Sequence, residues 1–351
     1  MRNISSYILA LIIAGCAEQG EKFVIYSPHG KELLEDFQMR FERDHPGTRV
    51  QWLDMGSQDA LDRVRSERSN PQADLWWGAP APLFMQAAEE GLLEPYRPSW
   101  AASVDSMYHD HQDRWYGNWL TPEVIMFNSR KLNKETAPQD WDDVVDEKWR
   151  GQIVLRDPLA SGTLRAIFFA MIYRDYRTTG STAAGFEWLR KLDANTKTYA
   201  ANPALLYLQL ARGEVLFTLW NLPDVPLQVT RYKNPFDYVV PKSGVPMVPE
   251  GMAIVAGAKH GELARTFYEY VTTPEAFLHA AKAYWRIPAR TDLDFSQFSP
   301  ETDPRNFPPL PMDWKLFADS SETWMKYWDA HIRNRGARSL PTNGKSGERG
   351  M

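Results

Sequence analysis

The sequence predicts an α/β protein with a mixed, mostly parallel sheet flanked by helices. Two series of short apolar, β-rich runs alternate with segments of helical periodicity, one from residue 23 to 80 and one from residue 124 onward. The chain has 351 residues, and chains of this length usually fold into more than one domain, each with its own hydrophobic core. Hydrophobic residues make up 43% and charged residues 24%, as in an ordinary globular protein. Two domains are therefore expected.

The first series predicts a β-α-β-α-β unit. Strands are expected at residues 23–26, 49–53 and 73–78, and helices at residues 31–43 and 57–68. Leu33, Leu34, Phe37 and Phe41 recur on one face of the first helix, and a Pro-Gly pair ends it. Right-handed crossovers would place the loops at residues 27–30 and 78–81 beside one crevice, because ligands of such sheets bind beyond the carboxyl ends of the strands.

The second series predicts a second α/β unit. The expected strands are residues 124–127, 152–155, 215–220, 236–240 and 252–255, the last of which should return to the first lobe. The expected helices are residues 164–176, 185–193, 203–212, 263–271 and 274–284. We place the first lobe at 22–120 plus 245–293 and the second at 121–244 plus 294–333. Residues 334–351 lack periodicity and are expected to be a disordered tail.

The N-terminus has the pattern of an export signal that ends at a lipidated cysteine. A short apolar run, residues 8–13, follows a positively charged start and is too brief to cross a bilayer. Ile13-Ala14-Gly15-Cys16 then matches a bacterial lipobox. We expect a signal peptide at 1–15, a lipidated linker at 16–21 and membrane attachment through lipid on Cys16. The alternative is a buried N-terminal element with an ordinary cysteine.

Composition and missing motifs narrow the function. A net charge of −5 without a large basic patch argues against nucleic acid as a partner. The sequence has no Gly-x-Ser-x-Gly elbow, no His-Glu-x-x-His motif and no cysteine besides Cys16, which argues against an exported hydrolase. Because Cys16 is the only cysteine, an intrachain disulfide is impossible. We expect no cofactor and no metal.

Several short motifs, in order and spacing, resemble one known family. They are Pro46-Gly47-Thr48-Arg49-Val50, Ala73-Asp74-Leu75-Trp76-Trp77-Gly78, Glu90-Gly91-Leu92-Leu93-Glu94-Pro95, Trp115-Tyr116-Gly117, Gly213-Glu214-Val215 and Pro249-Glu250-Gly251-Met252-Ala253-Ile254. From about residue 23 to 290 the chain resembles the bacterial extracellular solute-binding proteins of ABC importers, in their ferric-iron-binding branch. The resemblance implies a type II periplasmic-binding-protein fold, in which two lobes joined by hinge strands close around a ligand.

The iron site of that branch does not carry over. Ferric-binding members use a His after the first strand, a Glu after the third and an adjacent Tyr pair after a later strand. Here His29 lies within one position of the first, Ala79 stands for the Glu, and Pro223-Asp224 stands for the Tyr pair. Fe(III) requires several anionic oxygen donors, and Asp224 could supply one. Dedicated ferric binding is therefore not expected, and Fe(III) held by Asp224, His29 and an accompanying anion is kept as an alternative.

An anion-binding element does match the family. Ser161-Gly162-Thr163 lies between a strand and a helix, and resembles a serine-glycine loop that contacts a phosphate-like anion. A helix start presents unpaired N–H groups and the positive end of its dipole, and two hydroxyls add donors. The alternative is that Ser161 or Thr163 only caps the helix. Asn202 matches a cleft-lining position of the family or is a helix N-cap before Pro203.

The other candidate contacts come from the crevice loops. They are Ser27, His29, Trp77, Gly78, Trp220, Asn221 and Asp224. His29 could donate a hydrogen bond to an anion or cap the following helix, and strand alternation predicts that one ring of the Trp76-Trp77 pair enters the core while the other faces the cleft. Together with the export signal and the lipobox at Cys16, the resemblance implies a monomeric lipoprotein in the periplasm or at the cell surface. It would capture a small organophosphate, phosphonate or carboxylate and deliver it to an inner-membrane ABC permease. A surface adhesin is a further alternative.

Overall fold

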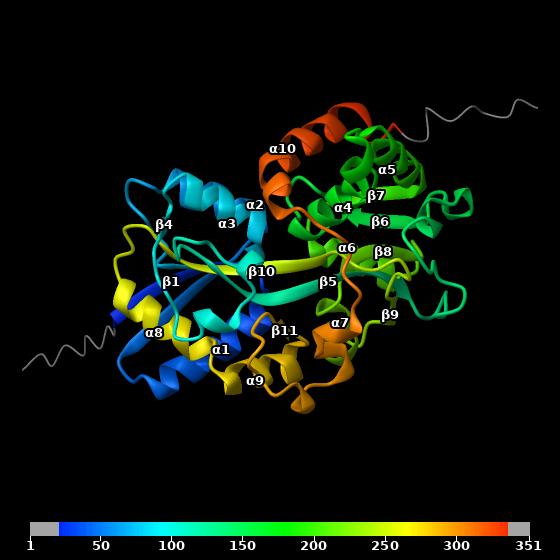
Figure 1. Cartoon of the computed structure of the whole chain (residues 1–351). Coiled ribbons are helices and arrows are strands. Elements are labelled where there is room, and N and C mark those ends of the chain that lie inside the picture. The colour runs from blue at the N-terminus through cyan, green and yellow to red at the C-terminus, as the bar shows by residue number, and fades with distance from the viewer. Residues whose placement is uncertain (1–20, 336–351) are drawn as a thin grey trace, which may run out of the picture.

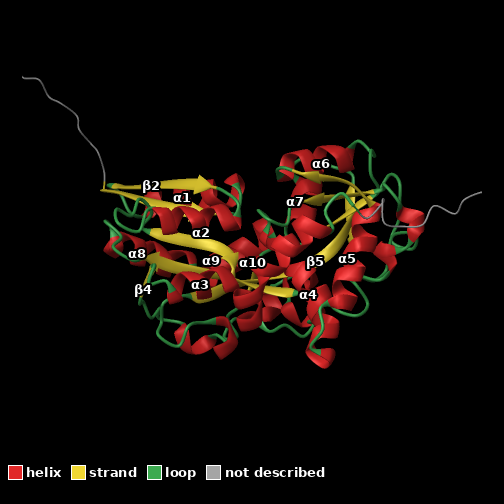
Figure 2. Ribbon diagram, turned by 90° about the horizontal axis from the view of Figure 1, so that it is seen from above, coloured by secondary structure: helices red, strands yellow, loops and turns green. Residues whose placement is uncertain are grey.

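The computed structural model describes residues 21–335, and these form two α/β lobes side by side (Figures 1 and 2). Their strands follow the order β2-β1-β3-β10-β5-β8-β6-β7, while β4, β9 and β11 pair at the side of this path. We call the half around β1 to β3 the first lobe and the half around β6 to β8 the second lobe. The predicted signal peptide, Cys16, most of the linker and all but the first two residues of the predicted tail lie outside the described residues.

The strands and helices have the following bounds. The strands are β1 (Glu21–Ser27), β2 (Thr48–Asp54), β3 (Leu75–Pro80), β4 (Leu93–Glu94), β5 (Tyr116–Asn128), β6 (Ile153–Arg156), β7 (Thr196–Ala200), β8 (Phe217–Asn221), β9 (Phe236–Val239), β10 (Met247–Val255) and β11 (Ile287–Pro288). The helices are α1 (Lys31–Asp44), α2 (Ser57–Ser66), α3 (Ala81–Glu89), α4 (Gly162–Thr179), α5 (Ala183–Asn195), α6 (Pro203–Ala211), α7 (Asp224–Thr230), α8 (Gly261–Val271), α9 (Pro274–Tyr284) and α10 (Trp314–His331).

The α/β class is as the sequence predicts, and the predicted strands and helices occur in the predicted order, whereas α3, α7, α10, β4, β7 and β11 were not predicted. In the first lobe, β1 pairs in parallel with β2 and β3. In the second lobe, β6 pairs in parallel with β7 and β8. The predicted return of residues 252–255 to the first lobe is confirmed, because β10 pairs with β3 and β4. No helix in the described part of the chain is long and apolar enough to cross a membrane.

Two long strands run between the lobes. The first half of β5 pairs with β10 and β11, and its second half, from Glu123 onward, pairs with β8 and β9. β10 pairs with β5 through Met247–Met252 and with β3 through Glu250–Ile254. The expected lobe boundary at residues 120–121 therefore falls inside a continuous strand, which Figure 1 shows crossing the middle of the molecule beside β10.

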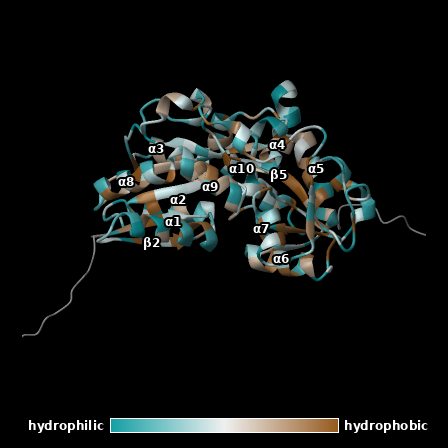
Figure 3. Cartoon of the chain, turned by 90° about the horizontal axis from the view of Figure 1, so that it is seen from below, coloured by the Kyte–Doolittle hydropathy of each residue, from teal (hydrophilic) through white to brown (hydrophobic). Residues whose placement is uncertain are grey.

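The core is divided in the same way as the sheet. One cluster fills the second lobe, and two others cover the two faces of the first-lobe sheet. Trp76 and Trp77 project to opposite faces, yet both are fully buried, since Trp76 stacks on Phe84 and Trp77 meets Phe37 edge to face. The expectation that one of these rings faces the cleft is therefore wrong, because helices cover both faces. In Figure 3 hydrophobic colour follows interior strands such as β5.

A C-terminal helix that the sequence reading missed joins the lobes behind the strands. Trp314 and Phe317 of α10 pack with Phe169 of α4 and Val248 of β10 in one apolar cluster. The other end of α10 enters the core of the second lobe through Met325 and Trp328. On the first lobe, Gln86 of α3 donates a 2.7 Å hydrogen bond to the carbonyl of Ala318. The helix therefore contacts both halves.

Candidate functional site

A cavity of about 440 Å³ lies between the lobes. Its walls come from the carboxyl ends of strands in both lobes and from the loops that follow them. They are Pro28, Asp54, Met55, Gly56, Ser57 and Asp59 of the first lobe, and Arg156, Ala160, Ser161, Gly162, Thr163, Ala201, Asn202, Pro203, Trp220, Asn221 and Asp224 of the second. The cavity thus sits where an α/β sheet of this kind usually binds its ligand.

Three helices point their N-terminal ends at this cavity. They are α2, which begins after Gly56, α4, which begins after Ser161, and α6, which begins after Asn202. The first amides of an α-helix have no acceptor inside the helix, and its dipole places partial positive charge at this end. Amide donors from both lobes therefore converge on one space, which favours an anion.

Ser161 and Asn202 each cap a helix and also line the cavity. The Ser161 hydroxyl accepts a 3.3 Å hydrogen bond from the Leu164 amide, and the Asn202 side-chain oxygen accepts one of 2.9 Å from the Leu205 amide. The two readings of these residues are thus compatible. Capping holds each side chain at the helix start. Gly162 and Thr163 after Ser161 also line the cavity and have backbone amides, whereas Pro203 after Asn202 has no amide hydrogen to donate.

The loop before α4 is held by Arg165. Its guanidinium donates to the carbonyls of Pro158 and Leu159, and its Nη1 donates a 2.7 Å hydrogen bond to Oε1 of Gln58 in the first lobe. A Cβ on Gly162 would lie 2.7 Å from Cγ of Pro80. The loop is therefore rigid on one side and tightly apposed to the first lobe on the other.

A buried cation lines the same cavity. Arg156, the last residue of β6, is 9% exposed, and its Nη1 donates to the carbonyl of Ala200 at 3.1 Å. Burial lowers the pKa of its guanidinium, which nevertheless stays charged at neutral pH, as arginine does in proteins. Among the described residues no carboxylate lies within 4.0 Å of it, and the carboxylates of Asp157 and Asp59 act on its charge from farther away. A buried charge without a direct ion pair is unfavourable, so this position favours an anionic ligand.

Asp224 projects a fixed carboxylate at the cavity. Its Oδ2 accepts hydrogen bonds from the Tyr207 hydroxyl at 2.7 Å, Trp220 Nε1 at 2.9 Å and Asn221 Nδ2 at 3.0 Å. The Asn221 oxygen in turn accepts from the Asp224 amide. Trp220, Asn221 and Asp224, expected together from the sequence, are brought together around this one oxygen.

Beyond Asp224 the cavity continues into a smaller chamber of about 80 Å³. Both spaces are lined by Pro28, Ser57, Thr163, Asn221 and Asp224, and the deeper one adds His29, Pro80, Glu123, Val248, Glu250 and Arg286. Glu123 belongs to β5 and Glu250 to β10, so the crossing strands form part of its wall. We call this space the deep chamber.

Burial dominates the acid-base properties of the deep chamber. It raises the pKa of Glu123 well above the usual range, with the charge of Glu250 adding to the effect, and it also raises the pKa of Glu250 itself. Burial lowers the pKa of His29 well below its usual value, and the charge of Arg286 acts in the same direction. His29 is therefore neutral at neutral pH.

The remaining sequence candidates lie behind the cavity wall. Ser27 is fully buried, and its hydroxyl accepts a 3.2 Å hydrogen bond from the His29 amide. Trp77 meets the His29 ring edge to face, with 5.4 Å between ring centroids. Gly78 has φ +93°, and a Cβ there would lie 2.5 Å from Nε2 of His29. None of these three lines the two described spaces, and all of them hold His29 in place.

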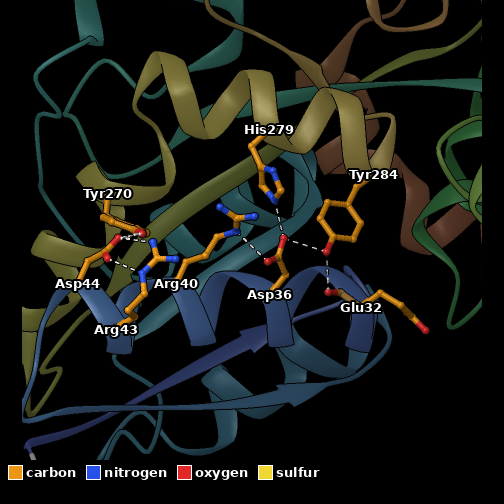
Figure 4. A network of polar contacts seen from close by, with 8 residues as sticks. All are labelled: Glu32, Asp36, Arg40, Arg43, Asp44, Tyr270, His279 and Tyr284. Carbon is orange, nitrogen blue, oxygen red and sulfur yellow. Dashed lines mark hydrogen bonds and ion pairs between the residues drawn. The ribbon is translucent and has the colours of Figure 1, made fainter.

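Another cavity, of about 680 Å³, opens between α1, α9 and the segment after α7. Figure 4 shows the part of it where Asp36 of α1 accepts hydrogen bonds from Arg40, His279 and Tyr284. Although burial opposes it, these bonds lower the pKa of Asp36. The charge of Asp36 is thus neutralised by direct contacts inside the protein, whereas Arg156 has no direct ion pair. This groove is therefore a weaker candidate for binding an ionic ligand.

Sequence reasoning missed Arg156 and the residues that line the deep chamber. Arg156 directly follows the strand predicted at residues 152–155 and precedes the anion loop, so its position was a usable signal. Glu123 begins the second predicted series, but nothing in its neighbours indicated burial. Arg286 lies 3.7 Å from Glu250 across 36 positions of sequence. These two residues come together only in the folded chain, so no local sequence pattern predicts their contact.

Comparisons with known proteins agree with this architecture. A family model described as bacterial extracellular solute-binding protein matches residues 38–307. A probable ABC transporter periplasmic-binding protein of Sinorhizobium fredii is 23% identical over 338 residues, covering 95% of this chain and 93% of that one. A Salmonella typhimurium protein named as a candidate 2-aminoethylphosphonate-binding periplasmic protein is 27% identical over 254 residues, covering 70% of this chain and 71% of its own length.

Solved structures show the same fold. The periplasmic binding protein P5PA matches with a TM-score of 0.78 and 25% identity, over 89% of this chain and 99% of that one. AfuA of Actinobacillus pleuropneumoniae, solved with fructose-6-phosphate, matches with a TM-score of 0.78 and 24% identity, over 90% and 99%. The ferric binding protein of Campylobacter jejuni matches with a TM-score of 0.73 and 19% identity, over 88% and 98%. The chain belongs to the bacterial extracellular solute-binding proteins, which serve ABC importers.

Proposed function

We propose that this protein captures a small solute bearing a phosphoryl or phosphonyl group in the cavity between its lobes and delivers it to an ABC permease. It catalyses no reaction in this account. It acts as a monomer on the outer side of the inner membrane or at the cell surface, where lipid on Cys16 holds it. Solute binding favours the closed arrangement of the lobes, and the closed form is the one the permease receives.

The observation that carries this proposal is the buried guanidinium of Arg156 beside three helix starts. A phosphoryl group has several oxygens and up to two negative charges, so it can accept hydrogen bonds from separate amides and from a guanidinium at once. The start of α4 follows β6 after a short loop, and Gly162 lets the backbone approach a ligand closely. A carboxylate, with two oxygens and one charge, uses fewer of these donors.

The relatives support the same class of solute. One is named for 2-aminoethylphosphonate, and one solved neighbour holds fructose-6-phosphate. Both molecules combine a tetrahedral phosphorus group with a short organic part. The two share no feature of that organic part, so the relatives support the phosphorus group and leave the rest open.

The alternatives draw less support from the cavity. Ferric iron held by His29 and Asp224 requires further anionic oxygens, and no group of three potential ligands is assembled within residues 21–335. A hydrolase would use Ser161, whose hydroxyl already caps α4. Neither alternative explains the position of Arg156.

Isothermal titration calorimetry tests the proposal. The purified protein should bind at least one compound from a panel of sugar phosphates and phosphonates, and small-angle scattering should show compaction. Replacing Arg156 by Gln should weaken that binding at least about 10-fold, since hydrogen bonds to charged groups contribute about 1.5–3 kcal/mol. The matched control is Arg150→Gln, an exposed arginine of the same lobe. Equal affinity of the Arg156→Gln variant and the control would contradict the proposal.

A further inference from the structure

The deep chamber contains polar groups that the protein itself does not satisfy. Within the described part of the chain, Oε2 of Glu123, Oε2 of Glu250, Nε of Arg286 and Nε2 of His29 are buried and have no hydrogen-bond partner. All four side chains line the chamber. Buried polar atoms almost always have partners, so four such atoms around one small space indicate that something else fills it.

Direct contacts inside the chamber are too long to satisfy these atoms. Oε2 of Glu250 lies 3.5 Å from Nδ1 of His29 and 3.7 Å from Nη1 of Arg286. Both distances exceed a good hydrogen bond, and the one to Arg286 allows ionic attraction. The other oxygen of Glu250 accepts a 2.9 Å hydrogen bond from Thr121, which fixes the carboxyl in place. The free oxygen is thus held at a defined position on the wall.

The unsatisfied atoms are of opposite kinds. The Glu123 and Glu250 oxygens accept hydrogen bonds, and a carboxyl that keeps its proton also donates one, whereas the N–H at Nε of Arg286 only donates. A hydroxyl group both donates and accepts, so one or two hydroxyls can match all of these atoms. An ammonium group only donates, and it would place a second positive charge next to Arg286. An apolar group would leave all of these atoms unsatisfied.

The chamber is continuous with the larger cavity. Thr163 of the anion loop lines both spaces, and Glu123 lines the deeper one. A solute whose charged end lies at the start of α4 would therefore extend past Thr163 toward the two crossing strands. At about 80 Å³ the chamber has room for the end of a small molecule and not for the whole of one.

We propose that the solute carries hydroxyl groups at the end opposite its phosphoryl group, and that Glu123, Glu250 and Arg286 bind those hydroxyls in the deep chamber. This inference rests on the proposed function and narrows the solute to phosphorylated polyols. It also places part of the bound solute against β5 and β10. A solute in the chamber would then contact β5 and β10, the strands that connect the lobes.

The test compares four compounds by calorimetry on the unmodified protein. They are glucitol 6-phosphate, 6-aminohexyl phosphate, n-hexyl phosphate and inorganic phosphate. We expect glucitol 6-phosphate to bind at least about 100-fold more tightly than each of the others, because a site with buried hydrogen-bonding groups rejects analogues that cannot pair with them. The three six-carbon compounds have the same reach and differ in what they place in the chamber.

The possible outcomes distinguish a failure of the hydroxyl-binding inference from a failure of the proposed phosphoryl-binding function. Tightest binding of the amine would show a cation site, and tightest or equal binding of the alkyl compound would show that hydroxyls are not recognised. Equal binding of inorganic phosphate would show that water alone fills the chamber. Each of these overturns the inference and leaves the phosphoryl site standing. Failure of all four, and of every sugar phosphate and phosphonate of the first panel, to bind contradicts the proposed function itself.

Variants then test the residues. Glu123→Leu and Arg286→Met should lower the preference for glucitol 6-phosphate over inorganic phosphate at least about 10-fold, while Glu123→Gln, which keeps one acceptor oxygen, should lower it less. Glu187→Leu, at an exposed position of α5, is the control. A structural role alone would weaken both ligands equally. An unchanged preference in folded variants, checked by thermal unfolding, overturns the assignment of these residues.

Discussion

Arg165 in the first turn of α4 donates a 2.7 Å hydrogen bond to the side-chain oxygen of Gln58 in the first turn of α2. The two residues belong to different lobes and are 107 positions apart in sequence. The same guanidinium holds the carbonyls of Pro158 and Leu159. One side chain thus shapes the anion loop and joins it to the opposite lobe.

Replacing Gln58 by Ala should weaken solute binding several-fold with little change in thermal stability. The bond contributes to the closed arrangement by about 0.5–1.5 kcal/mol or somewhat more because the donor is charged, and Arg165 retains its carbonyl partners. Stopped-flow measurements of solute release should show faster dissociation. Gln72→Ala, at an exposed position of the first lobe, is the control. An unchanged dissociation rate would contradict a role for this bond in closure.

Replacing Gly162 by Ala should impair closure without unfolding the protein. In an ordinary helix this change is stabilising by about 0.5–1 kcal/mol. Here the new Cβ would lie 2.7 Å from Pro80 and 3.0 Å from the Ser57 hydroxyl, both in the other lobe. Small-angle scattering in the presence of solute should give a larger radius of gyration than for the unmodified protein. Full compaction would show that the lobes do not need this close approach.

Replacing Asp224 by Asn should lower stability by about 1–3 kcal/mol. One of its oxygens accepts three hydrogen bonds, from Tyr207, Trp220 and Asn221, and bonds to a charged acceptor are the stronger ones. Urea unfolding followed by tryptophan fluorescence measures the change. Asp237→Asn serves as the control, because that carboxylate has a partly exposed ion pair with Lys134. Similar small losses for both variants would argue against a structural role of the Asp224 contacts.

Replacing Glu123 by Gln should stabilise the protein increasingly as the pH rises. Burial raises the pKa of Glu123, so the folded chain keeps this proton to a higher pH than the unfolded chain does. Between the two pKa values the unfolded chain binds fewer protons, and the stability of the folded state falls with rising pH. The amide does not titrate. The difference in unfolding free energy, variant minus unmodified, should be larger at pH 8 than at pH 5, and a constant difference would contradict the assignment.

Much of the fold was predictable because its signals are local. The faces of α1 and α8 repeat with helical period, and Pro203 and Pro274 mark helix starts. The missed α10 has Trp314, Phe317, Met325 and Trp328 buried against two different lobes, so its apolar residues do not form one simple stripe. The missed α7 begins at Asp224 after a Leu-Pro pair that reads as a turn.

The site was predictable in part for the same reason. The loop from Ser161 to Thr163 is contiguous in the chain and follows a strand, so its chemistry can be read from neighbouring residues. The deep chamber cannot, because Glu123, Glu250 and Arg286 meet through the pairing of β5 with β10 and the return of the chain after α9. Trp76 and Trp77 show a similar limit. Strand alternation predicts that they lie on opposite faces of the sheet, but it does not predict that helices cover both faces.

In the proposed binding mode, the cavity between the lobes receives a phosphorus-containing group at the start of α4. A crystal structure of the protein with the solute that co-purifies with it would locate that group. We expect a phosphoryl or phosphonyl group hydrogen-bonded to the Gly162 and Thr163 amides and to the guanidinium of Arg156. A bound solute that has no such group, or whose charged end lies away from Arg156, would contradict this binding mode.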